Sequence, residues 1–489
     1  DDSEARFLFT ANREIREEIE GIQADGELGD IEHIVHFDGG GGDDFDALLE
    51  QGKGKEQPLA EPDPQDVCAL IYTSGTTGNP KGVLLTHRNI TSNINAIHDI
   101  DIIEPDDVSL AFLPWAHSFG QTAELHGLFS IGASMGLVED ISTIIENLGE
   151  VRPTLLFSVP RVFNKIYDGV HRKIHKESAF KKKLFEWSMS NATKLREAHE
   201  RGKSPLFRSM LDSIFDSLIF STVRERFGGR LRYAVSGGAK LNEDVALFLD
   251  SLHITVLEGY GLTETSPLVS VNLPDERKIG SVGKPIPEVD VTIVPAEGHG
   301  KNDDEGEVCV KGPNVMKGYF KLPDKTREVL DDDGTFHTGD LGRFDDDGFL
   351  YIIGRVKEQF KLENGKYVVP GPMEEDIKLS NYVDQVMIDG ANRPFNIAIV
   401  NVDQEGLDDW ADEHDIELDD YTGERVRTLI EQDLEERMAD FKKYERPRRF
   451  ILVDDEWSAE NGILTPTLKL KRRIILDKYA DEIEALYRD

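Results

Sequence analysis

The sequence predicts an α/β protein with more than one domain, and three observations carry this prediction. The chain has 489 residues, more than one hydrophobic core usually serves. Two apolar, strand-like runs, Leu231–Val235 and Ile254–Leu257, each break into glycine-rich turns, which is typical of a sheet that binds ligand at its strand ends. From Ile279 onward, short strand-like runs alternate with Gly and Pro turns and predict a small β-subdomain.

The charge balance is strongly acidic. There are 56 Lys and Arg against 94 Asp and Glu, a net charge of −38, which disfavours broad electrostatic binding to nucleic acid or anionic lipid headgroups. The acids include the runs Asp331–Asp333 and Asp345–Asp347, which flank glycines, and we interpret these runs as solvated turns and not as metal sites. One hypothesis for the excess is life in high salt, where screening removes the self-repulsion.

The cysteines and the hydropathy of the chain indicate where in the cell the protein is located. Cys68 and Cys309 lie in apolar, strand-like runs and are interpreted as reduced core residues. No apolar run approaches the roughly 20 residues that span a bilayer, and no signal peptide is visible. We therefore expect a cytoplasmic location.

The stretch Thr73–Gly82 (TSGTTGNPKG) follows a strand-like run and crowds hydroxyls, glycines and one lysine together. Glycines let backbone N–H groups converge, and the hydroxyls and Lys81 add donors for phosphate oxygens. The Walker pattern is absent because Pro80 precedes Lys81 and Gly82 stands where Ser or Thr would hold magnesium. The stretch predicts a polyphosphate cradle, the alternative being a flexible surface turn. Its candidate phosphate-binding residues are Thr73, Ser74, Gly75, Thr76, Thr77, Gly78 and Lys81.

Two further segments place polar side chains after predicted strands. In Glu258–Ser266 (EGYGLTETS), Tyr260 can stack on a purine, Glu264 offers a hard oxygen ligand for Mg²⁺, and Thr263 offers a hydroxyl for phosphate. A strand-like run at 108–113 leads into a Pro, Trp, His and Gly segment that contains His117. A lone histidine of this kind is more often structural, so both interpretations of His117 stay open.

Four motifs in order resemble the signatures of the adenylate-forming (AMP-binding) superfamily. They are T-S-G-T-T-G-x-P-K-G from Thr73, Y-G-x-T-E from Tyr260, T-G-D with G-R-x-K at 338–357, and T-P-T-x-K at 465–469. A long helical stretch at about 162–227 and the T-P-T-L-K ending resemble the long-chain acyl-CoA synthetases (long-chain fatty-acid–CoA ligases). The resemblance covers residues 10–489.

The resemblance implies a domain plan. A large domain, residues 1–356, would consist of stacked α/β subdomains and the β-subdomain, bind AMP and the acyl group, and carry a helical insertion at about 162–227. A smaller, mobile α+β domain, residues 357–489, would follow a hinge at Lys357. In the family the Thr/Gly loop lies much farther from the start than Thr73 does here, so we expect an N-terminal portion to be missing.

The resemblance also implies site roles. His117 would border the acyl carboxylate and the passage of the thiol, and Asp340 and Arg355 would hold the ribose hydroxyls. Lys469 would hold the acyl carboxylate and the α-phosphate, with spacing favouring it over Lys471. The expected catalytic residues are Lys469, Thr263, Glu264 and His117, with Glu264 as the metal ligand. The expected nucleotide-binding residues, besides the cradle, Asp340 and Arg355, are Gly237, Gly238, Ala239, Glu258, Gly259 and Tyr260.

The implied activity is activation of a long-chain fatty acid by ATP and Mg²⁺ to acyl-AMP and pyrophosphate, followed by thioester formation with coenzyme A. One alternative is a fatty-acyl-AMP ligase that passes the acyl group to a carrier protein. Another is a truncated, non-catalytic binder of nucleotide or fatty acid. A local basic patch in the helical stretch suggests transient contact with the inner face of a membrane, and a homodimer is a further hypothesis; nucleic acid is not an expected partner.

Overall fold

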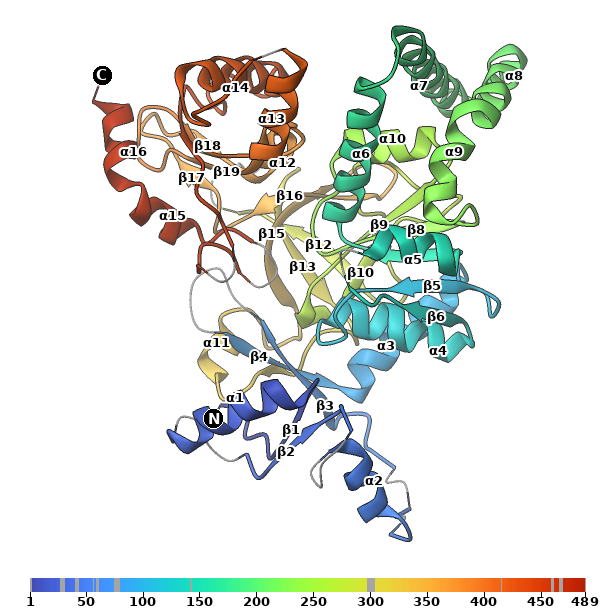
Figure 1. Ribbon diagram of the computed structural model, residues 1–489. Coiled ribbons are helices and arrows are strands. Elements are labelled where there is room, and N and C mark those ends of the chain that lie inside the picture. The colour runs from blue at the N-terminus through green and yellow to red at the C-terminus, as the bar shows by residue number, and fades with distance from the viewer. Residues whose placement is uncertain are drawn as a thin grey trace. The chain divides into compact units, whose positions relative to one another are not determined.

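The computed structural model describes residues 2–26, 31–39, 44–55, 57–58, 61–73, 80–140, 143–296, 304–414, 416–458, 461–465 and 469–488 (Figure 1). The chain divides into two compact units, Asp1–Leu70 and Ile71–Asp489. The predicted division at 356/357 is a different one and stays a prediction. In the parts of the chain that the structure describes, no helix is both long and apolar enough to cross a bilayer.

The first unit is a small α/β arrangement. Strands β1 (Phe7–Thr10) and β2 (His33–His36) pair in parallel, and helices α1 (Arg13–Ala24) and α2 (Phe45–Gly52) begin at the side-chain caps Asn12 and Asp44. Each cap accepts a hydrogen bond from a backbone N–H of the first turn, which satisfies one donor that has no partner inside the helix.

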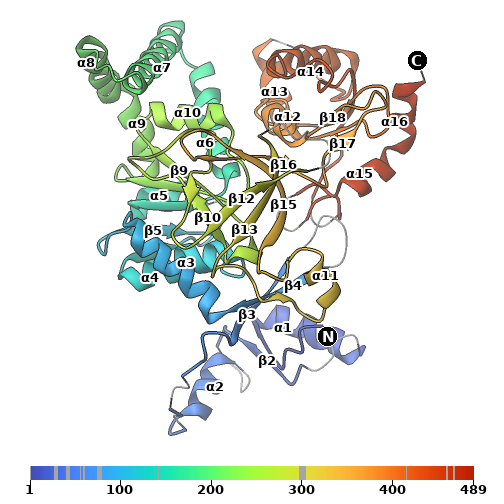
Figure 2. The same cartoon turned by 180° about the vertical axis from the view of Figure 1, so that it is seen from behind.

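The centre of the second unit is a sheet of order β11-β10-β9-β8-β7-β5-β6 (Figures 1 and 2). Strands β5 to β9 run parallel, whereas β10 and β11 are antiparallel additions at one edge. Parallel strands need crossover helices, which bury both faces of such a sheet. The predicted α/β class is confirmed. The strands are β5 (Val108–Ala111), β6 (Ser134–Leu137), β7 (Leu155–Ser158), β8 (Tyr233–Ser236), β9 (Thr255–Gly261), β10 (Leu268–Val271) and β11 (Lys284–Pro285).

Helices connect and cover these strands. α3 begins after Thr86, because Thr86 and Asn89 form a reciprocal capping box at its first turn. The connecting helices are α3 (His87–Ile100), the π-helical segment η1 (Phe119–His126), α4 (Gly127–Ile131), α5 (Ile144–Val151) and α10 (Glu243–Ser251).

The stretch 162–227 is occupied by a helical assembly. Its elements are α6 (Pro160–His175), α7 (Ala179–Glu200), α8 (Leu206–Phe215), the π-helical segment η3 (Asp216–Phe220), α9 (Ser221–Arg224) and the 3₁₀ turn η4 (Glu225–Phe227). Phe163, Phe185, Phe215, Phe220 and Phe227 from these elements join one buried core with the neighbouring α/β elements.

The predicted β-subdomain is an antiparallel sheet of order β12-β13-β15-β16. A second, shorter pairing joins β4 to β14, and α11 follows β14. The elements are β4 (Lys81–Thr86), β12 (Asp290–Val294), β13 (Gly306–Lys311), β14 (Gly318–Tyr319), α11 (Pro323–Arg327), β15 (Phe336–Phe344) and β16 (Leu350–Arg355).

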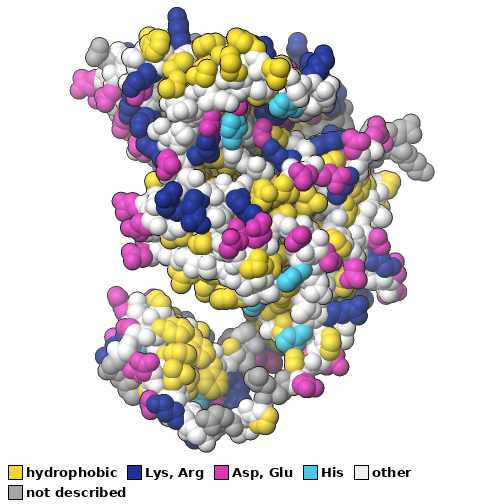
Figure 3. Space-filling view, turned by 90° about the vertical axis from the view of Figure 1, so that its right-hand side faces the viewer, with side chains coloured by type: hydrophobic (Ala, Val, Ile, Leu, Met, Phe, Trp, Pro, Cys, Tyr) yellow, Lys and Arg dark blue, Asp and Glu magenta, His cyan; other side chains and the backbone are white. Residues whose placement is uncertain are grey.

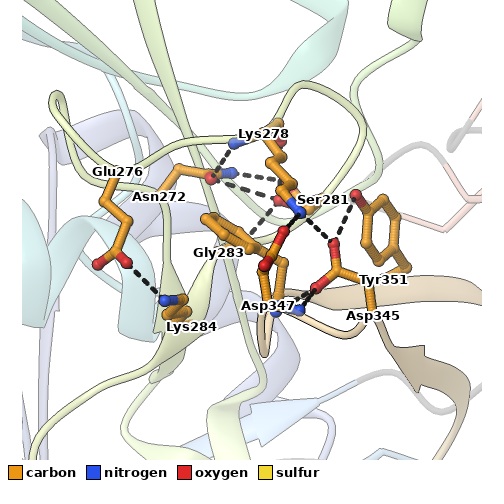
Figure 4. A network of polar contacts seen from close by, with 10 residues as sticks. Asn272, Glu276, Lys278, Ser281, Gly283, Lys284, Asp345, Asp347 and Tyr351 are labelled. Atoms are coloured by element: carbon orange, nitrogen blue, oxygen red, sulfur yellow. Dashed lines mark hydrogen bonds and ion pairs between the residues drawn. The ribbon is translucent and has the colours of Figure 1, made fainter. Parts of the chain in front are cut away.

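The acidic turn between β15 and β16 is organised by a lysine (Figure 4). The ammonium of Lys278 lies 2.7 Å from Asp345 Oδ2 and 2.5 Å from Asp347 Oδ2, while Asp345 Oδ1 accepts backbone hydrogen bonds from Asp347 and Phe349. The interpretation of this run as a solvated turn is confirmed for Asp346 and Asp347, which are exposed. Asp345 is only partly exposed and pairs with a lysine 67 residues away, which the sequence pattern does not reveal.

Residues 357–489 contain two small sheets and the helices that pack against them. Strand β19 (Val383–Asp389) is antiparallel to β20 (Ile397–Val402), which is parallel to β21 (Arg449–Val453), and β17 (Phe360–Lys361) pairs with β18 (Tyr367–Val368). The helices are α12 (Gly371–Ile377), α13 (Gln404–Glu413), α14 (Glu424–Arg437), α15 (Arg472–Lys478) and α16 (Ala480–Tyr487). One core cluster lies between the sheet and α12 and α14, and another between the sheet and α15 and α16.

Two local predictions fail for the same reason. Cys68 is interpreted as a core residue, yet Cys68 and its neighbour Val67 are exposed, because β3 (Val67–Thr73) is the edge strand of the order β14-β4-β3. Conversely, Glu258–Gly261 was predicted to be a turn, but β9 continues to Gly261 because it pairs with β10. Neighbouring strands, which a local pattern does not reveal, decide both cases. Cys309 is buried, as expected.

Candidate functional site

The chain leaves β9 through a tight turn that places the Thr263–Glu264 pair. A Cβ on Gly261 would lie 1.8 Å from the carbonyl oxygen of Pro267, so only glycine permits this close approach. Immediately afterwards Thr263–Thr265 forms a single 3₁₀ turn, η5, whose Thr265 hydroxyl accepts from the N–H of Leu262 at 3.0 Å. The turn fixes the backbone that carries Thr263 and Glu264.

One polar cluster joins β9, β15 and β16. Asp340 and Arg355 are register partners on adjacent strands, and Arg355 Nε donates to Asp340 Oδ1 at 2.6 Å. The hydroxyl of Tyr260 donates to the other oxygen, Oδ2, at 2.7 Å. Asp340 is buried and Arg355 is partly exposed. Burial and the neighbouring Asp340 hold the pKa of Tyr260 well above its usual value, so the phenol stays a donor.

A supporting network fixes the backbone beside Asp340. Glu307 Oε1 accepts from the N–H of Gly339 at 3.0 Å, and its Oε2 lies 3.0 Å from Nδ1 of His337. Nε2 of His337 lies 3.2 Å from Asp331 Oδ2. The carboxylates of Glu307 and Asp331 raise the pKa of His337, which favours the imidazolium. Gly339 takes a positive φ of 72°, a conformation that suits glycine at this irregular point of β15.

A second cluster joins the end of the Thr/Gly stretch to Glu264. The ammonium of Lys81, at the start of β4, lies 4.7 Å from the centroid of the Tyr319 ring. The Tyr319 hydroxyl in turn donates to Glu264 Oε1 at 2.9 Å. Burial and the carboxylate of Glu264 raise the pKa of Tyr319 far above the physiological range. Strand pairing of β14 with β4 brings Tyr319 to Lys81.

Lys469 lies within electrostatic range of both clusters. It closes a short loop, because its carbonyl accepts from the N–H of Thr465 at 2.8 Å and its own N–H donates to the Thr465 hydroxyl at 3.0 Å. Desolvation and the positive charge of Arg355 lower the pKa of Lys469, while Asp340, Glu358 and Glu264 act in the opposite direction. These charged groups therefore lie within electrostatic range of the Lys469 ammonium.

Another carboxyl lies at the same end of the sheet. Glu258 is buried on β9, and its Oε1 accepts from the N–H of Gly280 at 3.3 Å. Burial raises the pKa of Glu258 to about 7. A carboxyl with this pKa is about half protonated at neutral pH, and its protonated form can donate a hydrogen bond as well as accept one.

The segment after β5 approaches the same region. The Ser118 hydroxyl lies 3.4 Å from Oγ1 of Thr263, and an added Cβ on Gly237 would lie 3.2 Å from the Phe119 ring. His117 is exposed, and its N–H donates to the carbonyl of Pro114 at 2.9 Å. His117 therefore lies next to a residue that touches Thr263, and its predicted catalytic role stays a prediction.

The structure connects part of the predicted site by direct contacts. Tyr260, Asp340 and Arg355 form one contact group, and Lys81 is linked to Glu264 through Tyr319. Thr263 contacts Ser118, and Lys469 lies within electrostatic range of Asp340, Arg355 and Glu264. Gly237, Gly238 and Ala239 follow β8, and Glu258 and Gly259 lie in β9. Thr73 ends β3, and its hydroxyl lies 3.5 Å from the carbonyl of Lys81. Ser74, Gly75, Thr76, Thr77 and Gly78 lie outside the described residues. Lys357, the predicted hinge, is exposed in the turn that follows β16, two residues after Arg355.

Glu264 fits a magnesium ion. Mg²⁺ in nucleotide sites is held by one or two carboxylates, with the remaining ligands supplied by water and substrate phosphates. Glu264 provides one such carboxylate, partly buried and oriented through its Oε1 by Tyr319. Its neighbour Thr263 adds a hydroxyl on the same turn.

Sequence reasoning missed Tyr319. Its ring contacts Lys81 and its hydroxyl contacts Glu264, so it links two motifs that are far apart in the chain. Gly318 and Tyr319 form only a two-residue strand, which no periodic pattern marks. The one available signal was the aromatic pair Tyr319–Phe320 between Lys317 and Lys321.

Two family models match the chain. Residues 1–320 match the model described as AMP-binding enzyme, and residues 357–489 match the model described as AMP-binding enzyme C-terminal domain. The long-chain acyl-CoA synthetase 7, peroxisomal, of Arabidopsis thaliana is 35% identical over 91% of this chain and 64% of its own length. A long-chain-fatty-acid–CoA ligase, FadD15, of Mycobacterium bovis is 32% identical over 99% of this chain and 80% of its own length.

A solved structure shares the architecture of a large N-terminal and a smaller C-terminal domain. The adenylation domain of a carboxylate reductase from Mycobacterium chelonae matches with a TM-score of 0.72 and 25% identity, over 99% of this chain and 73% of that one. The chain spans about 64% of the length of the Arabidopsis relative.

Proposed function

This chain belongs to the AMP-binding enzyme family, and on that premise we propose that it is a long-chain fatty-acid–CoA ligase. The observation that supports the proposal most directly is the pair of polar clusters Tyr260–Asp340–Arg355 and Lys81–Tyr319–Glu264. Lys469 lies within electrostatic range of Asp340, Arg355 and Glu264. Relatives named as long-chain acyl-CoA synthetases or ligases support the acyl class.

The first half-reaction joins two anions. An oxygen of the fatty-acid carboxylate attacks the α-phosphorus of ATP, the bond to the bridging oxygen breaks, and pyrophosphate leaves with acyl-AMP formed. Because both reactants are negative, catalysis consists mainly of charge neutralisation and alignment. Lys469 would hold the carboxylate and an α-phosphate oxygen, and Lys81 with the hydroxyls of the Thr/Gly stretch would hold the β- and γ-phosphates.

The nucleoside would be held by the first cluster. Asp340 accepts hydrogen bonds and Arg355 donates them, which suits two ribose hydroxyls. Tyr260 would stack on adenine, with Gly237–Ala239 and Glu258–Gly259 bordering the base. Magnesium on Glu264 would supply positive charge to the phosphate oxygens, with Thr263 beside it.

The second half-reaction needs another arrangement. The thiol sulfur of coenzyme A attacks the acyl carbon, AMP leaves, and the thiol proton is lost to solvent or a base, so His117 at the thiol passage is the candidate group. We place the hinge between residues 356 and 357, so that rotation about Lys357 withdraws Lys469 and admits the pantetheine arm. Such a rotation would break the hydrogen bond from Asn242 Nδ2 to Asp376 Oδ1, which is 2.6 Å long.

Pyrophosphate release with acids of increasing chain length, with and without coenzyme A, tests the proposal. We expect release to depend on ATP and Mg²⁺, to favour long acids, and to turn over repeatedly only with coenzyme A. Release with no acyl-CoA formed, but with transfer to a carrier protein, would establish the fatty-acyl-AMP ligase alternative. Absence of release with every acid would establish a non-catalytic binder. Cytoplasmic location and homodimer formation stay predictions.

A further inference from the structure

Helix α8 and segment η3 carry a row of exposed apolar side chains. Phe207, Met210, Ile214 and Leu218 recur every three or four residues and are 67%, 56%, 46% and 62% exposed, and Leu206 beside them is 85% exposed. This spacing puts them on one side of the helix. We call these five residues the apolar stripe.

The apolar stripe is separate from the residues through which α8 and η3 pack into the protein core. The same two elements already bury another side, where Phe215 and Phe220 are 2% and 0% exposed in the main core. The Trp187 ring of α7 packs edge-on against Phe215 at 4.9 Å between centroids, and Trp187 itself stays 54% exposed. Two apolar sides on one short helix indicate a fold contact and a separate binding surface.

The charge around the stripe is opposite to that of the molecule. Residues 160–230 carry 16 Lys and Arg against 8 Asp and Glu, a net of +8, whereas the rest of the chain carries 40 against 86, a net of −46. Lys181, Lys183, Lys194 and Lys203 of this segment are exposed. Hydrophobic side chains gather along the top of the view in Figure 3, over α7 and α8, with Lys and Arg at the margin.

We propose that the apolar stripe and its lysines dock this protein on an anionic lipid bilayer. Aromatic and aliphatic side chains bordered by lysine are the composition of helices that lie in a membrane interface, with the apolar face among the upper acyl chains and the ammoniums among the phosphates. The inference rests on the proposed function for its purpose, since a long-chain acid partitions into the bilayer where this surface would rest.

The overall acidity does not oppose this docking. Charges in physiological salt are screened over about 8 Å, so the distant acidic surface acts weakly on a bilayer that touches α7 and α8. A second copy of the chain is a poorer occupant, because a two-fold contact through the stripe would bring two positive segments together.

Vesicle flotation of the full chain tests the docking without ATP, acid or coenzyme A. The vesicles are phosphatidylcholine alone or an equimolar mixture with phosphatidylglycerol. The stripe variant is F207S/M210S/L218S, the charge variant is K183E/K203E, and the matched control is F129S/L137S/I145S, whose three apolar side chains are exposed to a similar extent on other elements. Circular dichroism and urea unfolding establish that each variant folds.

We expect the wild type and the control variant to float with the anionic vesicles and to be released at molar salt. The stripe and charge variants should each lose about tenfold or more of the bound fraction. The proposal is overturned if the wild type does not float, if the stripe variant floats like the wild type, or if the control variant loses binding equally. The proposal is also overturned if the wild type is a dimer by light scattering, the stripe variant is a monomer, and neither of these two proteins binds vesicles.

Vesicle flotation and the pyrophosphate-release assay test the docking surface and the ligase function independently. Vesicle binding with no pyrophosphate release would refute the ligase function and leave the docking surface intact. Pyrophosphate release that favours long acids, without vesicle binding, would support the ligase function and refute the docking surface.

Discussion

Arg355 holds Asp340 by a hydrogen bond from Nε to Oδ1 of 2.6 Å, and strand pairing makes the two residues direct partners across β15 and β16. The second carboxylate oxygen is occupied by Tyr260. Asp340 is therefore oriented before any nucleotide binds, and a ribose would meet a carboxylate whose direction is already set.

Replacing Arg355 with Met should weaken both binding and stability. The variant leaves the buried Asp340 carboxylate with Tyr260 alone, which should lower the free energy of unfolding by about 1–2 kcal/mol, a modest value because Arg355 is partly exposed. The KM for ATP in pyrophosphate release should rise about tenfold or more. Urea unfolding measures the first effect. R343M is the control, since Arg343 lies over the Tyr351 ring on the same sheet and should leave KM unchanged.

Two substitutions separate the role of the Tyr319 ring from that of its hydroxyl. Y319F keeps the ring beside Lys81 but loses the hydrogen bond to Glu264, so we expect the Mg²⁺ concentration for half-maximal pyrophosphate release to rise several-fold. Y319A also loses the contact with Lys81 and should raise the KM for ATP as well. An equal Mg²⁺ requirement in Y319F and the wild type would show that the hydroxyl does not orient Glu264.

Lys469 should act in only one half-reaction. K469A should lower acyl-AMP formation by about a thousandfold while leaving thioester formation from supplied acyl-AMP near the wild-type rate. The matched control is K471A, because Lys471 lies two residues away at the start of α15. Equal loss of both half-reactions in K469A, or a larger loss in K471A, would reject the assignment.

The hinge proposal predicts an equally selective effect. K357P restricts the backbone at the point of rotation, so one conformation should be favoured and one half-reaction should slow while the other is retained. Separate assays of pyrophosphate release and of thioester formation from acyl-AMP measure this. Equal slowing of both assays would argue for a general structural defect.

Glu124 should make stability depend on pH. It is fully buried, its Oε1 accepts from Ser109 at 2.7 Å, and burial raises its pKa to about 7. The folded protein then binds more protons than the unfolded chain between about pH 4.5 and 7, so this group's contribution falls as pH rises through that window and stays low above it.

The variant E124Q removes that titration. The difference in unfolding free energy between E124Q and the wild type should shift by about 3 kcal/mol in favour of E124Q from pH 4.5 to pH 8, because each unit of pKa shift corresponds to about 1.4 kcal/mol. Urea unfolding across this pH range is the measurement. A constant difference at all pH values would mean that Glu124 has an ordinary pKa in the folded protein.

Much of the candidate site could be read from local chemistry. Thr73–Gly82, Glu258–Ser266 and the segments that contain Asp340, Arg355 and Lys469 each combine residue types whose hydrogen-bonding and charge suit a nucleotide, and this information is contained in a few adjacent residues. The α/β class was equally readable, because apolar runs that break into glycine-rich turns mark strand ends. Two features could not be read from the sequence, namely the exposure of Cys68 and the continuation of β9 through Tyr260. Both depend on which strands lie next to each other in the sheet.

By itself, then, the sequence determined the kind of chemistry, the order of the motifs and the excess of acidic over basic residues. Only the tertiary structure decided which partners those residues have. Tyr319 contacts Lys81 and Glu264 because β14 pairs with β4. Lys278 contacts Asp345 and Asp347 in the turn between β15 and β16. The apolar stripe likewise became visible only when Phe215 was buried and Ile214 was not. The physical reason is that periodicity records which residues share a side of an element, whereas burial depends on what the fold packs against each side.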